Sequence, residues 1–235
     1  MNNTERARPD LVLLPGTMCD ARLWADMVPL LAPHATLHHG DLTLDETIAA
    51  ITRRLLADVP EKFHLCGFSM GGYVAREIAL TAPDRVQTLV LVNTSSAGIT
   101  TDAMVRRHDM ARLLEGRPFP GLTRANLRKS VHPARADDTT LLERIQEMAV
   151  SLGGEVFARQ LRLPRGDGRE SLARIGCPAL VVAARDDKLR TLDESRTLAD
   201  GIPGARLEII EECGHMTPFE RPDVLAKLLI DWISK

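Results

Sequence analysis

Short apolar runs alternate with longer amphipathic stretches along most of this chain, and this alternation limits its possible folds more than any other feature. The runs are rich in Val, Leu and Ile, which is typical of strands buried on both faces of a parallel sheet. The predicted strands are Asp10–Leu14, Ala35–His39, Lys62–Cys66, Val86–Val92, Ala179–Ala183 and Arg206–Ile210. The predicted helices are Ala21–Leu31, Leu44–Ala57, Met70–Thr81, Asp193–Asp200 and Pro222–Ile233. The pattern predicts an α/β fold in which helices flank about six mostly parallel strands.

The alternation stops between Ser95 and Ile175, where helical patterns continue without a convincing strand. This segment contains 14 Lys and Arg against 10 Asp and Glu, so it is the basic part of a chain whose formal net charge is −2. We therefore expect a core domain formed by residues 1–94 and 176–235, with a helical insertion at residues 95–175 after the fourth strand.

The near balance of charge, 30 Lys and Arg against 32 Asp and Glu, argues against a nucleic-acid partner. The longest apolar runs, such as Leu11–Leu14 and Leu89–Val92, are far shorter than the ~20 residues of a membrane-spanning helix. The first residues also lack the apolar core of a secretory signal. These features predict a soluble cytoplasmic protein without a membrane partner.

The cysteines have no spacing that would close a zinc site or form a CxxC pair. We therefore expect reduced, structural thiols and no bound metal, with a nucleophilic cysteine as the alternative. The four positions are Cys19, Cys66, Cys177 and Cys213.

A G-x-S-x-G motif at Gly67, Ser69 and Gly71 follows a predicted strand and opens a predicted helix. This context is typical of a nucleophile elbow, in which a serine sits on a strained turn and its neighbours must lack side chains. The start of the helix also directs backbone N–H groups toward a developing oxyanion. A Gly- and Ser-rich turn without a catalytic role is the alternative.

A serine nucleophile needs a histidine base and a carboxylate that orients it. His215 follows the last predicted strand, so it should lie at the same sheet edge as the elbow. Asp186 and Asp187 follow the predicted strand Ala179–Ala183, whereas the preceding strand ends at the uncharged Asn93. The remaining histidines lack such a context: His34, His38, His39, His64, His108 and His132.

Together these residues resemble the α/β-hydrolase superfamily, over nearly the whole chain from Leu11 to Trp232. The run LVLLPGT that begins at Leu11 is similar to the family's first strand and oxyanion loop, with Pro15 where histidine is usual. The segment around Gly214 and His215 is similar to the family's terminal Gly-His segment. Within the superfamily, the chain resembles the small lidded group of esterases and lactonases that includes pimeloyl-carrier-protein methyl esterases and enol-lactonases.

The resemblance implies a role for each matching position. The acid would be Asp187 rather than Asp186, and the backbone N–H groups of Thr17 and Met70 would form the oxyanion hole. The helical insertion at residues 95–175 would be the lid. Few residues precede the first predicted strand, so we expect a sheet without the two extra N-terminal strands of many relatives.

Together these expectations predict a serine hydrolase that cleaves a carboxylic ester, thioester or lactone of a small molecule. Ser69, His215 and Asp187 would carry out the reaction, and no cofactor is expected. Basic side chains in the insertion suggest an acidic or carrier-linked substrate, although a solvated helix face is the stronger explanation. The arginines concerned are Arg106, Arg107, Arg159, Arg162 and Arg165. A cofactor-free carbon–carbon hydrolase, a perhydrolase and a non-catalytic binding protein remain alternatives, and the oligomeric state stays open.

Overall fold

The computed structural model describes residues 8–234 and contains a six-stranded sheet with strand order β2-β1-β3-β4-β5-β6. Every neighbouring pair of these strands is parallel, which confirms the predicted architecture. The strands are β1 (Asp10–Leu14), β2 (Thr36–His39), β3 (Phe63–Phe68), β4 (Val86–Val92), β5 (Ala179–Ala184) and β6 (Arg206–Ile210).

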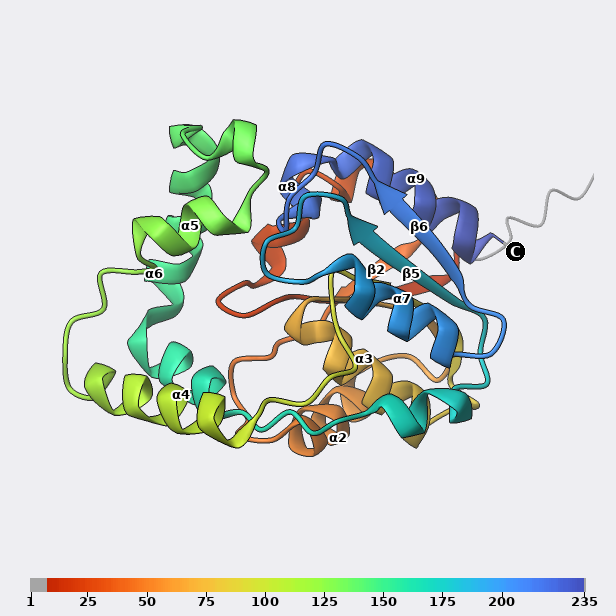
Figure 1. Ribbon diagram of the computed structural model, residues 1–235. Coiled ribbons are helices and arrows are strands. Elements are labelled where there is room, and N and C mark those ends of the chain that lie inside the picture. Colours follow the sequence, from red (N-terminus) through yellow and green to blue (C-terminus); the bar gives the residue numbers. More distant parts are fainter. Residues whose placement is uncertain (1–7, 235) are drawn as a thin grey trace, which may run out of the picture.

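Helices cover both faces of the sheet, because successive strand side chains point to opposite faces. The covering helices are α1 (Val28–Leu31), α2 (Ile48–Asp58), α3 (Met70–Thr81), α7 (Leu192–Gly201) and α9 (Pro222–Ile233). In β1, Leu11 and Leu13 belong to the apolar core beneath α1 and α9, whereas Val12 and Leu14 belong to the core beneath α2, α3 and α7. Figure 1 shows the two helical layers on either side of the strands.

Two helix boundaries differ from the sequence-based prediction. The single helix predicted at Ala21–Leu31 is a 3₁₀ turn at Ala21–Trp24 followed by α1, whose first turn contains Pro29. Proline has no N–H and is tolerated in a first turn but not in a helix interior, so the helix has to begin again there. The α2 helix begins at Ile48 rather than Leu44, because the Thr47 hydroxyl accepts a hydrogen bond from Ala50 N at 3.1 Å and caps it there.

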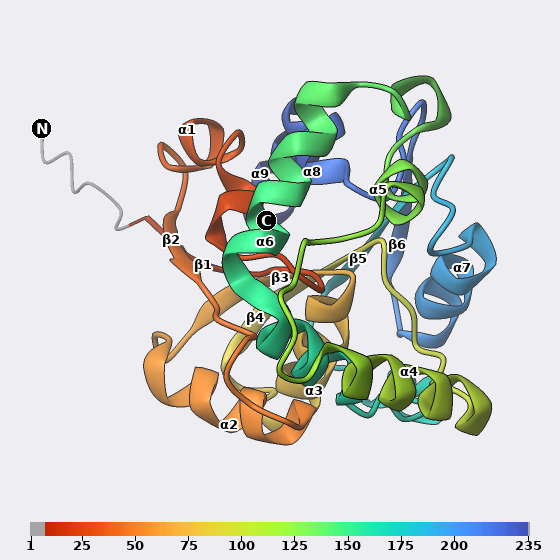
Figure 2. The ribbon, with the colours of Figure 1, turned by 90° about the vertical axis from the view of Figure 1, so that its left-hand side faces the viewer.

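The segment between β4 and β5 is helical, and no strand interrupts it in the described part of the chain. Figure 1 shows its helices beyond the end of the sheet toward which the β5 and β6 arrows point, and Figure 2 shows the same helices from that side. They are α4 (Thr101–Leu114), α5 (Arg124–Ser130) and α6 (Thr139–Arg162), with 3₁₀ turns at Pro133–Arg135 and Arg169–Arg174. None of the helices within residues 8–234 is long and apolar enough to cross a membrane.

The strand order determines which loops can meet. Because β3, β4, β5 and β6 are parallel neighbours, the loops that follow them leave the sheet at one edge. The loop after β1 joins them there, since β1 pairs with β3. A short helix, α8 (Thr217–Glu220), follows the loop after β6 and was not predicted.

Candidate active site

Ser69 lies at the tight turn between β3 and α3, at the centre of the sheet. Its backbone has φ 51° and ψ −110°, a conformation that a residue with a side chain rarely adopts. Ser69 N donates to Val92 O at 2.9 Å, and the Thr94 hydroxyl donates to Ser69 O at 2.6 Å. These contacts with β4 and the residues after it hold the strained turn in place.

The two glycines of the G-x-S-x-G motif are required by close backbone contacts. A Cβ atom on Gly71 would lie 2.4 Å from Leu14 O and 2.6 Å from Pro15 O. A Cβ atom on Gly67 would lie 2.5 Å from Gly71 O. Neither position can therefore hold a side chain while the serine turn packs against the loop that follows β1.

His215 lies in the loop after β6, where its side chain is almost completely buried. Its Nε2 atom is 3.0 Å from Ser69 Oγ, and its Nδ1 atom is 2.6 Å from Asp187 Oδ2. The imidazole also packs against the Phe68 ring, with ring centroids 5.0 Å apart. The structure thus brings Ser69, His215 and Asp187 into one hydrogen-bonded chain.

The two candidate aspartates after β5 have different partners. The side chain of Asp187 is buried, and its Oδ1 atom accepts hydrogen bonds from Leu189 N at 2.7 Å and Arg190 N at 2.9 Å. Asp186 is more exposed and lies 3.4 Å from His132 Nε2. Of the two, Asp187 is therefore the one that the structure places against the imidazole of His215.

Asn93, which follows the last residue of β4, links three parts of the site through its side-chain amide. The sequence did not predict this role. Its Oδ1 atom accepts from Ala184 N at 2.9 Å, and its Nδ2 atom donates to His215 O at 2.7 Å and to the Thr217 hydroxyl at 2.7 Å. Its backbone has a positive φ of 45°, which asparagine tolerates better than most residues. This amide ties β4 to the end of β5 and to the histidine loop.

Thr17 and Met70, the predicted oxyanion donors, belong to the two turns that meet at Ser69. Met70 is the first residue of α3, so its N–H group has no acceptor within the helix. Thr17 lines the cavity that contains Ser69. Its neighbour Met18 donates from its backbone N to Gln160 Oε1 at 2.8 Å, a contact that fixes this loop against α6.

A cavity of about 400 Å³ lies over Ser69 and His215. Its walls come from the loop after β1, from α4, α5 and α6, and from the loop after β5. Most of these lining side chains are apolar: Met18, Cys19, Phe68, Met110, Leu122, Ile145, Phe157, Leu161, Leu189 and Met216. Three arginines also line it: Arg107, Arg165 and Arg190.

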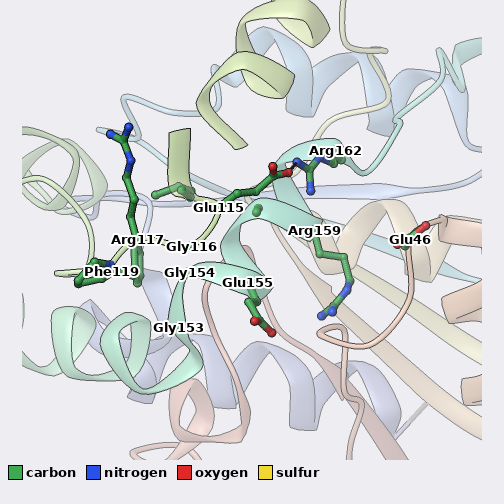
Figure 3. A pocket seen from close by; sticks show the side chains of 13 residues that line it. Glu46, Glu115, Gly116, Arg117, Phe119, Gly153, Gly154, Glu155, Arg159 and Arg162 are labelled. Atoms are coloured by element: carbon green, nitrogen blue, oxygen red, sulfur yellow. Dashed lines mark hydrogen bonds and ion pairs between the residues drawn. The ribbon is translucent and has the colours of Figure 1, made fainter. Parts of the chain in front are cut away.

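The predicted substrate-binding arginines are divided between different surfaces. Of the five, Arg107 and Arg165 line the Ser69 cavity, whereas Arg106 is exposed. Arg159 and Arg162 line a separate cavity of about 810 Å³ (Figure 3). Arg162 forms an ion pair there with Glu115, and Arg159 donates to the backbone oxygen of Thr43. The catalytic candidates do not line this larger cavity.

The cysteine thiols are protonated at neutral pH. Burial raises the pKa of Cys19, which lines the Ser69 cavity, to about 12, and it raises the pKa of Cys213 to about 12. Burial also raises the pKa of Cys66 and Cys177. A neutral thiol is a poor nucleophile, which favours the hydroxyl of Ser69. Within residues 8–234, no three His, Cys, Asp or Glu side chains gather as metal ligands would.

Comparison with known proteins identifies the class of protein to which the chain belongs. Residues 11–228 match the alpha/beta hydrolase family. A pimeloyl-[acyl-carrier protein] methyl ester esterase of Nitrosomonas europaea is 30% identical over 246 residues, covering 90% of each chain. A 2-hydroxy-6-oxononadienedioate/2-hydroxy-6-oxononatrienedioate hydrolase of Paraburkholderia phymatum is 26% identical and covers 100% of this chain and 90% of its own.

The fold is also found in solved structures. A thermophilic esterase from Thermogutta terrifontis superposes with a TM-score of 0.86 at 22% identity, covering 97% of this chain and 90% of its own. The chain therefore belongs to the alpha/beta hydrolase family. The predicted family, fold and hydrolase class are confirmed, and similarity to a named ester esterase agrees with the prediction of an ester-acting enzyme.

Proposed function

We propose that this protein is a serine hydrolase that cleaves a carboxylic ester, thioester or lactone of a small molecule. The observation that carries the proposal is the pair of hydrogen bonds that links Ser69 Oγ, His215 and Asp187, at 3.0 Å and 2.6 Å. This geometry is that of a nucleophile, a general base and an orienting carboxylate.

The proposed reaction begins with attack of Ser69 Oγ on the substrate carbonyl carbon. The serine proton passes to Nε2 of His215, while Asp187 accepts the hydrogen bond from Nδ1–H and stabilises the imidazolium that forms. When the tetrahedral intermediate collapses, His215 returns the proton to the leaving oxygen or sulfur. Water then attacks the acyl-enzyme with His215 again acting as the base, and Ser69 is released.

The N–H groups of Thr17 and Met70 are the proposed donors to the tetrahedral oxyanion. Contacts on each turn support this role: Gly71, next to Met70, packs closely against Leu14 O, and Met18 N, next to Thr17, donates to Gln160 Oε1. Rigid donors stabilise the transition state by about 3 kcal/mol each, because no reorganisation is needed as charge develops.

The helical segment at residues 95–175 is the proposed lid, and residues 1–94 and 176–235 are the proposed core domain. The support is that α4, α5 and α6 supply much of the wall of the Ser69 cavity. The similarity to a pimeloyl-[acyl-carrier protein] methyl ester esterase supports the prediction that the substrate is acidic or linked to a carrier. The predicted cytoplasmic location stays a prediction, consistent with four free cysteines.

Hydrolysis of p-nitrophenyl esters of increasing acyl length tests the proposal. The wild-type protein should release p-nitrophenol, and Ser69→Ala should remove this activity while the far-ultraviolet circular dichroism spectrum stays unchanged. A folded protein that is inert toward all chain lengths would instead belong to the non-catalytic binding class. Carbon–carbon cleavage or peroxyacid formation in preference to ester hydrolysis would favour the other two alternatives.

A further inference from the structure

Three guanidinium groups reach the Ser69 cavity from different parts of the chain. Arg107 comes from α4, Arg165 follows the end of α6, and Arg190 follows the acid loop after β5. Arg165 and Arg190 lie beside the same aromatic ring, with their Cζ atoms 5.4 and 5.9 Å from the centroid of Tyr73. One wall of a mostly apolar cavity is therefore strongly positive.

Two of these guanidinium groups, those of Arg190 and Arg107, have partners within the protein: a carboxylate for Arg190 and backbone oxygens for Arg107. Arg190 forms an ion pair with Glu194 at 3.2 Å. Arg107 donates to the backbone oxygens of Gln160 and Leu161, at 2.9 Å each, and so caps the carboxyl end of α6. Their contacts are explained by the fold itself.

Arg165 has no such explanation. It is 6% exposed, and its Nε atom is buried without a hydrogen-bond partner. No Asp or Glu within residues 8–234 forms an ion pair with it. Its contacts are the face of Tyr73 and a long hydrogen bond, 3.4 Å, from Nη2 to the Thr17 hydroxyl. A buried charge is ordinarily paired, because an unpaired one is costly to desolvate.

The electrostatics of the cavity favour an anion at this position. Burial, and after it the charge of Arg107, lowers the pKa of Arg165 to about 9, so the group remains positively charged at neutral pH. The ring of Tyr73 holds the guanidinium in place without cancelling its charge. A planar anion could pair with such a guanidinium through two parallel hydrogen bonds.

We propose that Arg165, assisted by Arg107 and Arg190, binds a carboxylate group of the substrate, so that the preferred substrate is the half-ester of a dicarboxylic acid. This inference rests on the proposed ester hydrolysis at Ser69 and names the substrate class for that site. Arg165 is the principal contact, since it alone of the three has neither an ion pair nor a side-chain hydrogen bond to a backbone oxygen.

The position of Arg165 places the carboxylate subsite close to the proposed oxyanion hole. Oγ1 and N of a threonine lie at most about 4 Å apart by standard bond lengths, so Nη2 of Arg165 lies within roughly 7 Å of Thr17 N. With a hydrogen bond of about 2.9 Å at each end, the ester carbonyl oxygen and the carboxylate of one substrate can lie up to about 13 Å apart. Succinyl and glutaryl half-esters fit within this distance.

Direct binding to the Ser69→Ala protein tests the subsite without turnover. Calorimetric titration compares monomethyl glutarate with methyl pentanoate, which replaces the carboxylate by a methyl group. We expect the half-ester to bind at least about 30-fold more tightly, and we expect Arg165→Gln to remove this preference, as loss of one partner of a buried charge pair would. Arg112→Gln, an exposed arginine on α4, is the matched control and should leave the preference unchanged.

Equal affinity for the two esters, or an unchanged preference in Arg165→Gln, would overturn the subsite. Tighter binding of methyl phosphate than of monomethyl glutarate would also overturn it, in favour of a phosphate site. A parallel assay follows hydrolysis of the two esters by the wild-type protein, in which Ser69 is present. Hydrolysis of both at equal kcat/KM would contradict the subsite but leave the proposed function intact, whereas carboxylate-selective binding without any hydrolysis would contradict the proposed function alone.

Discussion

Two adjacent aspartates in the loop after β5 show how strongly a side chain's neighbours determine what it can do. Asp187 accepts two backbone hydrogen bonds and contacts His215, whereas Asp186 faces His132. The backbone bonds to Asp187 fix its carboxylate toward the imidazole. In the proposed mechanism, Asp187 therefore holds His215 in the tautomer that leaves Nε2 free to accept the serine proton.

Replacing each aspartate by asparagine separates these roles. Asp187→Asn should lower kcat for a p-nitrophenyl ester by about 10⁴-fold, because the amide would favour the wrong tautomer of His215. Asp186→Asn, the matched control one position earlier, should stay within about tenfold of the wild type. A greater loss in Asp186→Asn, measured under the same steady-state conditions, would assign the acid to that residue.

The buried thiols provide a second test of the nucleophile. With a pKa of about 12, Cys19 has a thiolate fraction of only about 10⁻⁴ to 10⁻⁵ at pH 7.5. N-ethylmaleimide at this pH should therefore modify the partly exposed Cys177 first and leave ester hydrolysis within about twofold of its starting value. Inactivation that follows the labelling of Cys19 would instead implicate a thiol near the reaction.

Sequence reasoning found residues whose chemistry is tied to a local pattern. Ser69 could be located from its flanking glycines and His215 from its position after a strand, whereas only the family resemblance favoured Asp187 over Asp186. The roles of Asn93 and Arg165 could not be found in this way, because their partners are distant in sequence: His215 for Asn93, and Thr17 and Tyr73 for Arg165. Arg165 was grouped with other arginines of the insertion, and burial alone distinguishes it from the exposed Arg106.

Among the helices, α6 is interrupted at one residue, and its two halves pack against different parts of the molecule. Before Gly153, its side chains Leu141, Leu142, Ile145 and Met148 pack into the core cluster that contains α9. After Gly153, Ala158 and Leu161 pack against Ala111 of α4. The turn occurs at Gly153, whose φ of 84° and ψ of 171° lie outside the helical region.

Alanine at this interruption should destabilise the protein. Gly153→Ala should lower the free energy of unfolding by about 1–3 kcal/mol, since a side chain disfavours this backbone conformation although no atom obstructs it. Gly166→Ala is the matched control, because that site is equally open and its φ is not left-handed. Urea titrations that show equal effects for the two variants would contradict the strained backbone.

The strands and most of the covering helices could be predicted because their apolar periodicity is strong. The prediction was wrong at Ala21–Leu31, where apolar residues recur at helical spacing but Pro29 divides the segment. The short α8 helix was missed because Thr217–Glu220 is a single turn with too few residues to show a period. Such elements depend on tertiary packing rather than on their own sequence.

Across the whole molecule, side chains are more buried around the sheet than in the helical segment beyond the carboxyl ends of its strands. Most side chains of α3 are buried against β3 and β4, whereas in α4 only Ala111 is buried. Val105, Met110 and Leu113 of α4 are more than half exposed, at 55%, 51% and 61%. The helical segment that walls the cavity is thus less firmly packed than the sheet that positions Ser69.

Native-state hydrogen exchange should reflect this difference. Amides of α4 should exchange through openings that cost at least about 2 kcal/mol less than those that expose α3, because fewer buried contacts have to be broken. Mass spectrometry of peptides from the two helices would measure it. Equal protection of α3 and α4 would mean that the segment unfolds only together with the core.

The most direct test of the account is covalent labelling of the intact protein with a fluorophosphonate, followed by peptide mass spectrometry. We predict one adduct, located on Ser69, with complete loss of ester hydrolysis. Ser69→Ala should form no adduct, and His215→Ala should form it at a greatly reduced rate. A folded wild-type protein that takes up no label, or that is labelled at another residue while Ser69 stays unmodified, would contradict the assignment of Ser69 as the nucleophile.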